Sequence, residues 1–128
     1  MDGATQTDID AVTAAAETYC HAVYKAQQDV FETLCHDAFH MVGVDGPELQ
    51  TWDKAAYLAR VTARDAAEGD TKYKILTVEA DGDMARVKLL VGVPGTVYED
   101  YLGFVRVGGE WKLMNKLFRT ADSSALAG

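Results

Sequence analysis

The last third of the chain contains the pattern that most restricts its fold. Residues 98–118 read YEDYLGFVRVGGEWKLMNKLF, and two runs rich in aromatic and aliphatic side chains flank Gly108-Gly109-Glu110. Such runs around a glycine-containing turn predict a β-hairpin of two long antiparallel strands. This hairpin says more about the fold of the chain than about its function.

Two helices are predicted near the start of the sequence. Apolar residues recur at helical spacing over residues 8–27, and Thr7 with Asp10 resembles a capping arrangement at their start. Asp29 can open a second, short helix that ends near residues 35–37. We therefore expect one long amphipathic helix followed by a short one.

A strand and a third helix are predicted next. Residues 39–44 form a short apolar run, and Asp45-Gly46-Pro47 closes it with a turn signal. Thr51 has the position of an N-cap for the third helix, and Gly69 is a plausible end for it.

Everything after Asp70 is predicted to be β-structure. Residues 72–80 and 84–91 flank the loop Asp81-Gly82-Asp83, which predicts a hairpin ahead of the final one. Because the helices precede this run of antiparallel strands, they must cover one face of a curved sheet. The sequence thus predicts an α+β architecture in a single domain, residues 1–128.

Composition excludes several function classes. The chain has 20 acidic and 12 basic side chains and a net charge of −8, so nucleic acid and membrane surfaces are poor partners for it. No apolar run approaches the roughly 20 residues of a membrane helix, and no leader pattern is visible. Cys20 and Cys35 stand among apolar residues on predicted helices, where reduced, buried thiols are expected. These features predict a cytoplasmic protein.

The order of elements resembles the nuclear-transport-factor-2-like superfamily, and within it the small bacterial proteins described as putative lumazine-binding. The resemblance extends over nearly the whole chain. It rests on Asp29 after the first helix, on Cys35-His36-Asp37-Ala38, which looks like a Phe-His-Pro-Asp-Ala segment without its proline, on Thr51 to Tyr57, on Asp100-Tyr101-Leu102 and on Gly109 to Lys116.

The resemblance implies a fold and a small set of functions. The fold is a cone in which a curved antiparallel sheet and two shorter helices enclose a pocket against the long first helix. Some relatives, related to ketosteroid isomerases and to the SnoaL-like proteins, are isomerases, dehydratases or cyclases; others only bind a ligand, and many form dimers through the outer sheet face. Our first hypothesis is a homodimeric domain that binds an unknown small molecule in a mostly apolar cavity. The alternatives are an enzyme that transfers a proton, and a protein-interaction module without a ligand.

The resemblance also implies where a catalytic base would stand. Relatives similar to ketosteroid isomerases keep an aspartate base on the first strand, and alignment of Asp37 places that position at Val42, which cannot move a proton. Side chains alternate along a strand, so His40 would share the face of Val42. We therefore predict that His40 lies on the cavity wall, as a general base or as a core histidine held by one partner.

Two polar residues of the final hairpin are further candidates. Asp100 is either a buried acid that donates a hydrogen bond in the cavity, or a surface carboxylate paired with Lys116 or Arg106; its strand parity with Arg106 favours the surface. Asn115 shares parity with the apolar Leu113, which suits a hydrogen bond to a ligand or a structural bond to a loop.

Three aromatic residues complete the candidate ligand site. Tyr24 and Tyr57, from the first and third helices, could place hydroxyl groups over the cavity, although buried tyrosines serve packing first. Trp52 could stack on a flat ligand or pack as part of a lid.

Metal and cofactor chemistry find little support in the sequence. His36 stands four residues before His40 and beside Cys35 and Asp37, but a predicted break between helix and strand separates the two histidines. Zinc sites need three or four converging ligands. The chain also lacks a nucleophile elbow, a phosphate-binding loop and a dinucleotide fingerprint. We expect no metal and no cofactor.

Overall fold

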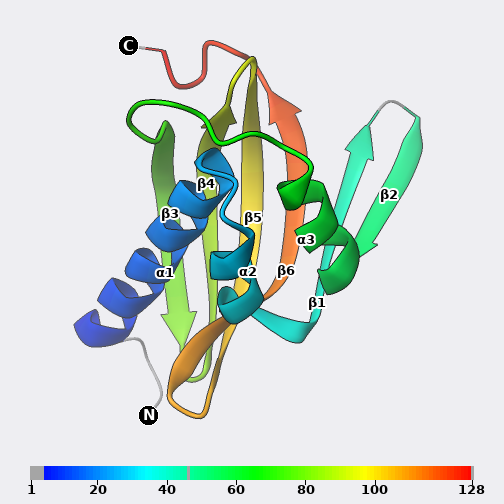
Figure 1. Cartoon of the computed structure of the whole chain (residues 1–128). Helices are drawn as coiled ribbons and strands as arrows, with labels where there is room; N and C mark the ends of the chain where they lie inside the picture. The colour runs from blue at the N-terminus through cyan, green and yellow to red at the C-terminus, as the bar shows by residue number, and fades with distance from the viewer. Residues whose placement is uncertain (1–4, 46, 128) are drawn as a thin grey trace.

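The computed structural model describes residues 5–45 and 47–127, which form three helices on one face of a six-stranded sheet (Figure 1). In chain order the elements are α1 (Gln6–Tyr24), α2 (Gln28–Leu34), β1 (Cys35–Asp45), β2 (Glu48–Asp53), α3 (Lys54–Thr62), β3 (Tyr73–Asp81), β4 (Met84–Val93), β5 (Thr96–Val107) and β6 (Glu110–Ala121). The predicted α+β architecture is confirmed.

The sheet is curved and open, and its strand order is β2-β1-β6-β5-β4-β3 (Figure 1). The predicted final hairpin is present: β5 and β6 pair along their length, and Gly108 and Gly109, with φ of 59° and 84°, form the turn between them. All neighbouring strands are antiparallel except β1 and β6, which run in the same direction. The sheet is therefore mixed, and this parallel pair places the first strand of the chain beside the last.

Helix α1 begins two residues before the predicted start. The hydroxyl of Thr5, not that of Thr7, accepts the amide hydrogen of Asp8 at 3.0 Å and caps the helix. Thr7 lies inside the first turn, so its predicted capping role is wrong. The apolar row predicted for this helix is buried, and it packs against β3 and β4.

Strand β2 was not predicted, and it displaces the start of the third helix. Thr51 lies in β2 opposite Val42, so its predicted role as N-cap is wrong. Asp53 takes that role: its carboxylate accepts the Ala56 amide at 2.8 Å. The helix ends at Thr62, seven residues before Gly69. Of the predicted turn at 45–47, Gly46 lies outside the described residues.

The core lies between α1, α2 and the concave face of the sheet. Phe31 of α2 is fully buried at its centre, and its ring meets the rings of Tyr19 and Tyr57 edge-on at 5.9 and 5.1 Å. Cys20 and Cys35 are buried free thiols, as predicted, and burial raises the pKa of Cys35 to about 12. None of the described helices is long and apolar enough to cross a membrane.

Candidate functional site

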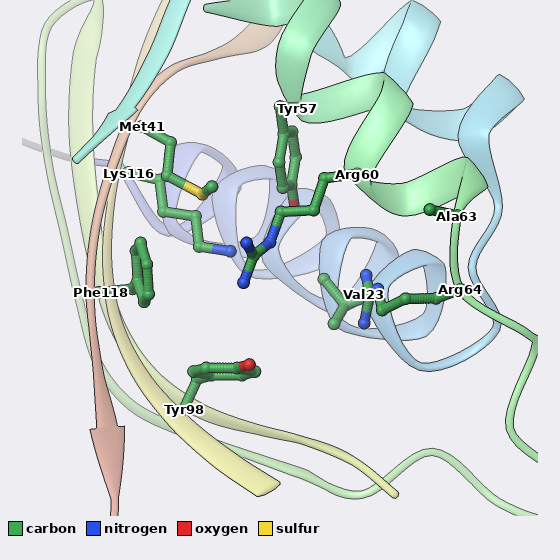
Figure 2. A pocket seen from close by; sticks show the side chains of 9 residues that line it. All are labelled: Val23, Met41, Tyr57, Arg60, Ala63, Arg64, Tyr98, Lys116 and Phe118. Carbon is green, nitrogen blue, oxygen red and sulfur yellow. The ribbon is translucent and has the colours of Figure 1, made fainter. Parts of the chain in front are cut away.

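A cavity of about 330 Å³ lies between α3 and the concave face of the sheet, beside the end of α1 (Figure 2). Its wall combines aromatic rings with the positively charged ends of long side chains. The lining residues are Val23, Met41, Tyr57, Arg60, Ala63, Arg64, Tyr98, Lys116 and Phe118.

The aromatic part of the wall is built on β5 and β6. The ring of Phe118 meets that of Tyr98 edge-on at 5.8 Å and packs against Trp52 at 5.7 Å. Phe118 pairs with Gly43 of β1, and a side chain at Gly43 would overlap the Phe118 ring. The absence of a side chain on β1 therefore makes room for the ring that borders the cavity.

Three cations point into the cavity. Figure 2 shows the guanidinium groups of Arg60 and Arg64 and the amine of Lys116 directed toward one space. Arg60 stacks on the Trp52 ring at 5.0 Å, and Arg64 follows α3 by a turn in which its amide donates to Val61. Within the described parts of the chain, neither arginine forms an ion pair, and Nε of Arg64 is buried without a hydrogen-bond partner. The wall thus presents unneutralised positive charge to the cavity of an acidic protein.

Behind this wall a carboxylate is buried with a tyrosine and the lysine. Asp100 is 0 % exposed; its Oδ2 accepts the Tyr19 hydroxyl at 2.5 Å and lies 3.9 Å from Nζ of Lys116. Burial raises the pKa of Asp100, while Lys116 and Tyr19 act in the opposite direction. Burial lowers the pKa of Lys116, the Asp100 carboxylate opposes this, and the arginines lower it further. One cation and one acid therefore share a site with little water.

The prediction that strand parity turns Asp100 toward the surface is wrong. Asp100, Leu102 and Phe104 are all buried, so this row of β5 faces the concave side. Arg106 belongs to the same row, but it reaches the rim of the sheet, where it pairs with Asp8 at 2.6 Å and Asp83 at 2.8 Å. The prediction that Asp100 and Arg106 share one face of β5 was correct, but that face is the concave one, not the outer one.

A β-bulge decides which residues of β6 face the cavity. Gly103 pairs with Asn115 but Phe104 pairs with Leu113, so Met114 is an extra residue without a partner. A bulge reverses the facing of every residue beyond it. Leu113 and Lys116 consequently both point inward, while Asn115 is exposed on the other face, with its side chain against Gly103. The inward position predicted for Asn115 is wrong for this reason.

His40 lies on the face of β1 opposite to the predicted one. Phe39 and Met41 are 1 % exposed and face the core, whereas His40 is exposed and does not border the cavity. Strand β1 begins at Cys35, not at Phe39, and its register with β6 shifts between Cys35 and His40. His40 and Val42 share a face, as predicted, but this face is turned away from the cavity, so the predicted place of His40 on the cavity wall is wrong.

The three predicted aromatic residues have different surroundings. Tyr57 borders the cavity, and its hydroxyl is buried without a partner among the described residues. The Trp52 ring packs against the guanidinium of Arg60 and the ring of Phe118. Tyr24 is buried but outside the lining, and its hydroxyl donates to the Glu68 carbonyl at 2.9 Å.

The segment weighed as a metal site has other contacts. His36 Nδ1 accepts the amide hydrogen of Ala38 at 3.0 Å, Asp37 lies 3.3 Å from the Lys54 amine, and Cys35 is buried. Among the residues that the structure describes, no three His, Cys, Asp or Glu side chains converge as metal ligands do.

Sequence reasoning did not single out Arg60, Arg64 or Tyr19, and it named Lys116 only as a partner of Asp100 on the surface. Arg60 and Arg64 have i, i+4 spacing at the end of the third helix, which places them on one side of it and is the signal that could have found them. Lys116 gave no such signal, because its inward position depends on the bulge at Met114.

Comparisons with known proteins agree on the fold. A family model described as putative lumazine-binding matches residues 7–119. A nuclear-transport-factor-2-like protein of unknown function from Silicibacter pomeroyi DSS-3 is 26% identical, with a TM-score of 0.85 over 92% of this chain and 99% of that one. A similar protein of unknown function from Shewanella baltica OS155 has a TM-score of 0.85 at 17% identity, over 94% of this chain and 99% of that one. A ketosteroid isomerase-like protein from Erwinia carotovora atroseptica SCRI1043 has a TM-score of 0.73 at 16% identity, over 92% of this chain and 99% of that one. The comparison with curated proteins gave no match.

Proposed function

The chain belongs to the putative lumazine-binding family, and on this basis we propose that it binds a compact organic anion with a flat or apolar body in the cavity beside α3. The observation that supports this most is that the guanidinium groups of Arg60 and Arg64, at a wall of aromatic rings, have no ion-pair partner among the described residues. Guanidinium groups bind carboxylate and phosphate in a planar, two-pronged geometry.

The rest of the cavity suits the body of such a ligand. The rings of Tyr98 and Phe118 offer apolar faces against which a flat molecule can pack, and the buried Tyr57 hydroxyl offers one hydrogen bond. Small-molecule sites generally combine an apolar wall with a few fixed polar groups, in cavities of about 300–1,000 Å³. The volume of about 330 Å³ limits the ligand to the smaller end of that range.

The proposal can be tested with benzoate and its neutral analogue benzamide as probes of the full chain. Benzoate should bind more tightly, as measured by calorimetry or by NMR shifts of residues that border the cavity. Arg64→Ala should weaken benzoate binding about tenfold to a hundredfold, since a hydrogen bond to a charged group contributes about 1.5–3 kcal/mol. Arg60→Ala should have a smaller effect, because Arg60 is exposed and screened by solvent.

Arg119→Ala is the matched control for these variants. Arg119 is exposed on β6 and pairs with Glu99 at 2.7 Å, so its replacement removes the same charge at a distance from the cavity wall. It should leave benzoate binding unchanged. Equal affinities for benzoate and benzamide would contradict the proposal, and so would an Arg119→Ala effect as large as that of Arg64→Ala.

We further propose that the protein is a homodimer formed through the outer sheet face. Tyr101 of β5 pairs with Leu117 of β6, and both are about half exposed, at 50% and 51%. Leu117 pairs in turn with Val42 of β1, which extends this apolar stripe across three strands. A contiguous exposed apolar patch is typical of a protein interface.

A charge placed in the stripe tests the dimer. Leu117→Glu should convert a dimer into a monomer in size-exclusion chromatography with light scattering, because the carboxylate would lose its water at the interface. Met84→Glu is the control: Met84 is 61% exposed at the far end of β4, away from the stripe. A monomeric wild-type protein would contradict the proposal.

A further inference from the structure

The amine of Lys116 is held at the cavity wall by its surroundings. Lys116 is only 7% exposed, and its Nζ lies 5.2, 5.0 and 5.5 Å from the ring centres of Tyr19, Tyr57 and Phe118. It nevertheless borders the cavity, and in Figure 2 its nitrogen points toward the space that Arg60 and Arg64 enter. A ligand bound by the arginines would therefore lie beside this nitrogen.

Asp100 can accept a proton from the Lys116 ammonium, which is unreactive as long as it keeps that proton. Asp100 Oδ2 lies 3.9 Å from Nζ. Burial raises the pKa of Asp100 and lowers that of Lys116, so the two values move toward each other. Transfer of the proton from Lys116 to Asp100 leaves a neutral amine with a free lone pair, which is the nucleophilic form of lysine.

We propose that Lys116 forms a reversible imine with a small aldehyde or ketone that also carries an acidic group held by Arg60 and Arg64. This inference rests on the proposed function, because Arg60 and Arg64, the proposed anion site, select a ligand with an acidic group. The lone pair of Nζ attacks the carbonyl carbon, and the electrons of the C=O double bond move to oxygen. The resulting carbinolamine loses that oxygen as water with both amine hydrogens, and a C=N bond replaces C=O. Asp100, whose Oδ2 lies 3.9 Å from Nζ, can hold the ammonium proton during these steps.

The test uses 4-formylbenzoate, which adds an aldehyde to the benzoate probe, with cyanoborohydride to reduce any imine to a stable amine. Digestion and mass spectrometry of the full chain then identify the modified lysines. Lys116 should react at least about tenfold faster than the exposed Lys74, because the bound acid group holds the aldehyde beside the amine. Free benzoate should slow the reaction at Lys116 but not at Lys74.

Two variants separate chemistry from folding. Lys116→Arg keeps the charge but cannot form an imine, and Lys116→Met combined with Asp100→Asn removes the buried pair together; neither should acquire a modification at position 116. Arg64→Ala should slow the reaction at Lys116 and leave Lys74 unaffected.

The outcomes distinguish the two proposals. If benzoate binds but Lys116 reacts no faster than Lys74, the imine is overturned and the anion site stands. If Lys116 reacts equally fast with 4-formylbenzoate and with neutral 4-formylbenzamide, the anion site fails, and the acidic substrate class fails with it.

Discussion

Lys116→Met is expected to lower the free energy of unfolding by about 3–5 kcal/mol at pH 8, the cost of removing one partner from a buried charge pair. Asp100 is 0% exposed, so without the ammonium its carboxylate remains charged and away from bulk water. The Tyr19 hydroxyl would remain the one hydrogen-bond donor to the carboxylate among the described residues, because Asp100 Oδ1 already has no partner there. Denaturant unfolding followed by circular dichroism measures this change.

The loss should depend on pH, and Asp100 determines its sign. Burial raises the pKa of Asp100 above its ordinary value of 3.8, and loss of the Lys116 ammonium raises it further. The folded variant then keeps a proton that the unfolded chain releases. The retained proton stabilises the folded variant. This stabilisation is complete below pH 3.8, the ordinary pKa of the unfolded chain, and is lost as the pH rises through the raised pKa of the folded state. Lys116→Met should therefore be more stable near pH 4 than at pH 8.

The double variant Lys116→Met with Asp100→Asn is the control. Asparagine keeps an acceptor for the Tyr19 hydroxyl and has no charge to bury, so the double variant should recover most of the stability. Its stability should also lack the pH dependence that Asp100 gives the single variant. If the single and double variants unfold alike at pH 8, Lys116 and Asp100 are not coupled, and the account of this site is contradicted.

The sequence predicted those features that a short segment determines by itself. The apolar row of α1 and the two glycine turns of the β3–β4 and β5–β6 hairpins are examples, because helical spacing and turn chemistry need no distant partner. The nuclear-transport-factor-2-like fold followed from the order of these segments and from the resemblance.

The facing of polar residues could not be predicted in the same way. The bulge at Met114 depends on the pairing of β6 with β5, and it moves Lys116 inward and Asn115 outward. The facing of His40 depends on where β1 begins and on its parallel register with β6, in which His40 pairs with Asn115, a residue 75 positions later in the sequence. An alternating pattern gives the period of a strand but not the face that is buried.

The cavity is assembled from segments that lie far apart in the sequence. Arg64 follows α3, Tyr98 lies on β5 and Lys116 on β6, and only the folded sheet brings them together (Figure 2). The i, i+4 spacing of Arg60 and Arg64 indicates that they share one side of a helix, but it does not show that Lys116 and the aromatic rings lie opposite them, and this became recognisable only in the structure.

Phe31→Ala should have a stability effect as large as that of Lys116→Met, about 3–5 kcal/mol, because it leaves a void in the centre of the core. Phe31 is fully buried, and its ring packs edge-on against Tyr19 and Tyr57. Thermal or denaturant unfolding measures the loss. Benzoate binding, measured where the variant is folded, should change little, since Phe31 does not border the cavity.

Phe118→Ala is the matched control, because it removes the same ring from the cavity wall. Phe118 is half-buried and already borders empty space on one side, so fewer packing contacts are lost and the stability cost should be smaller. Benzoate affinity should fall more in Phe118→Ala than in Phe31→Ala, since a wall ring would contact the ligand directly. The two variants should thus rank in opposite orders for stability and for binding. If Phe31→Ala weakens benzoate more than Phe118→Ala does, the ligand does not occupy this cavity.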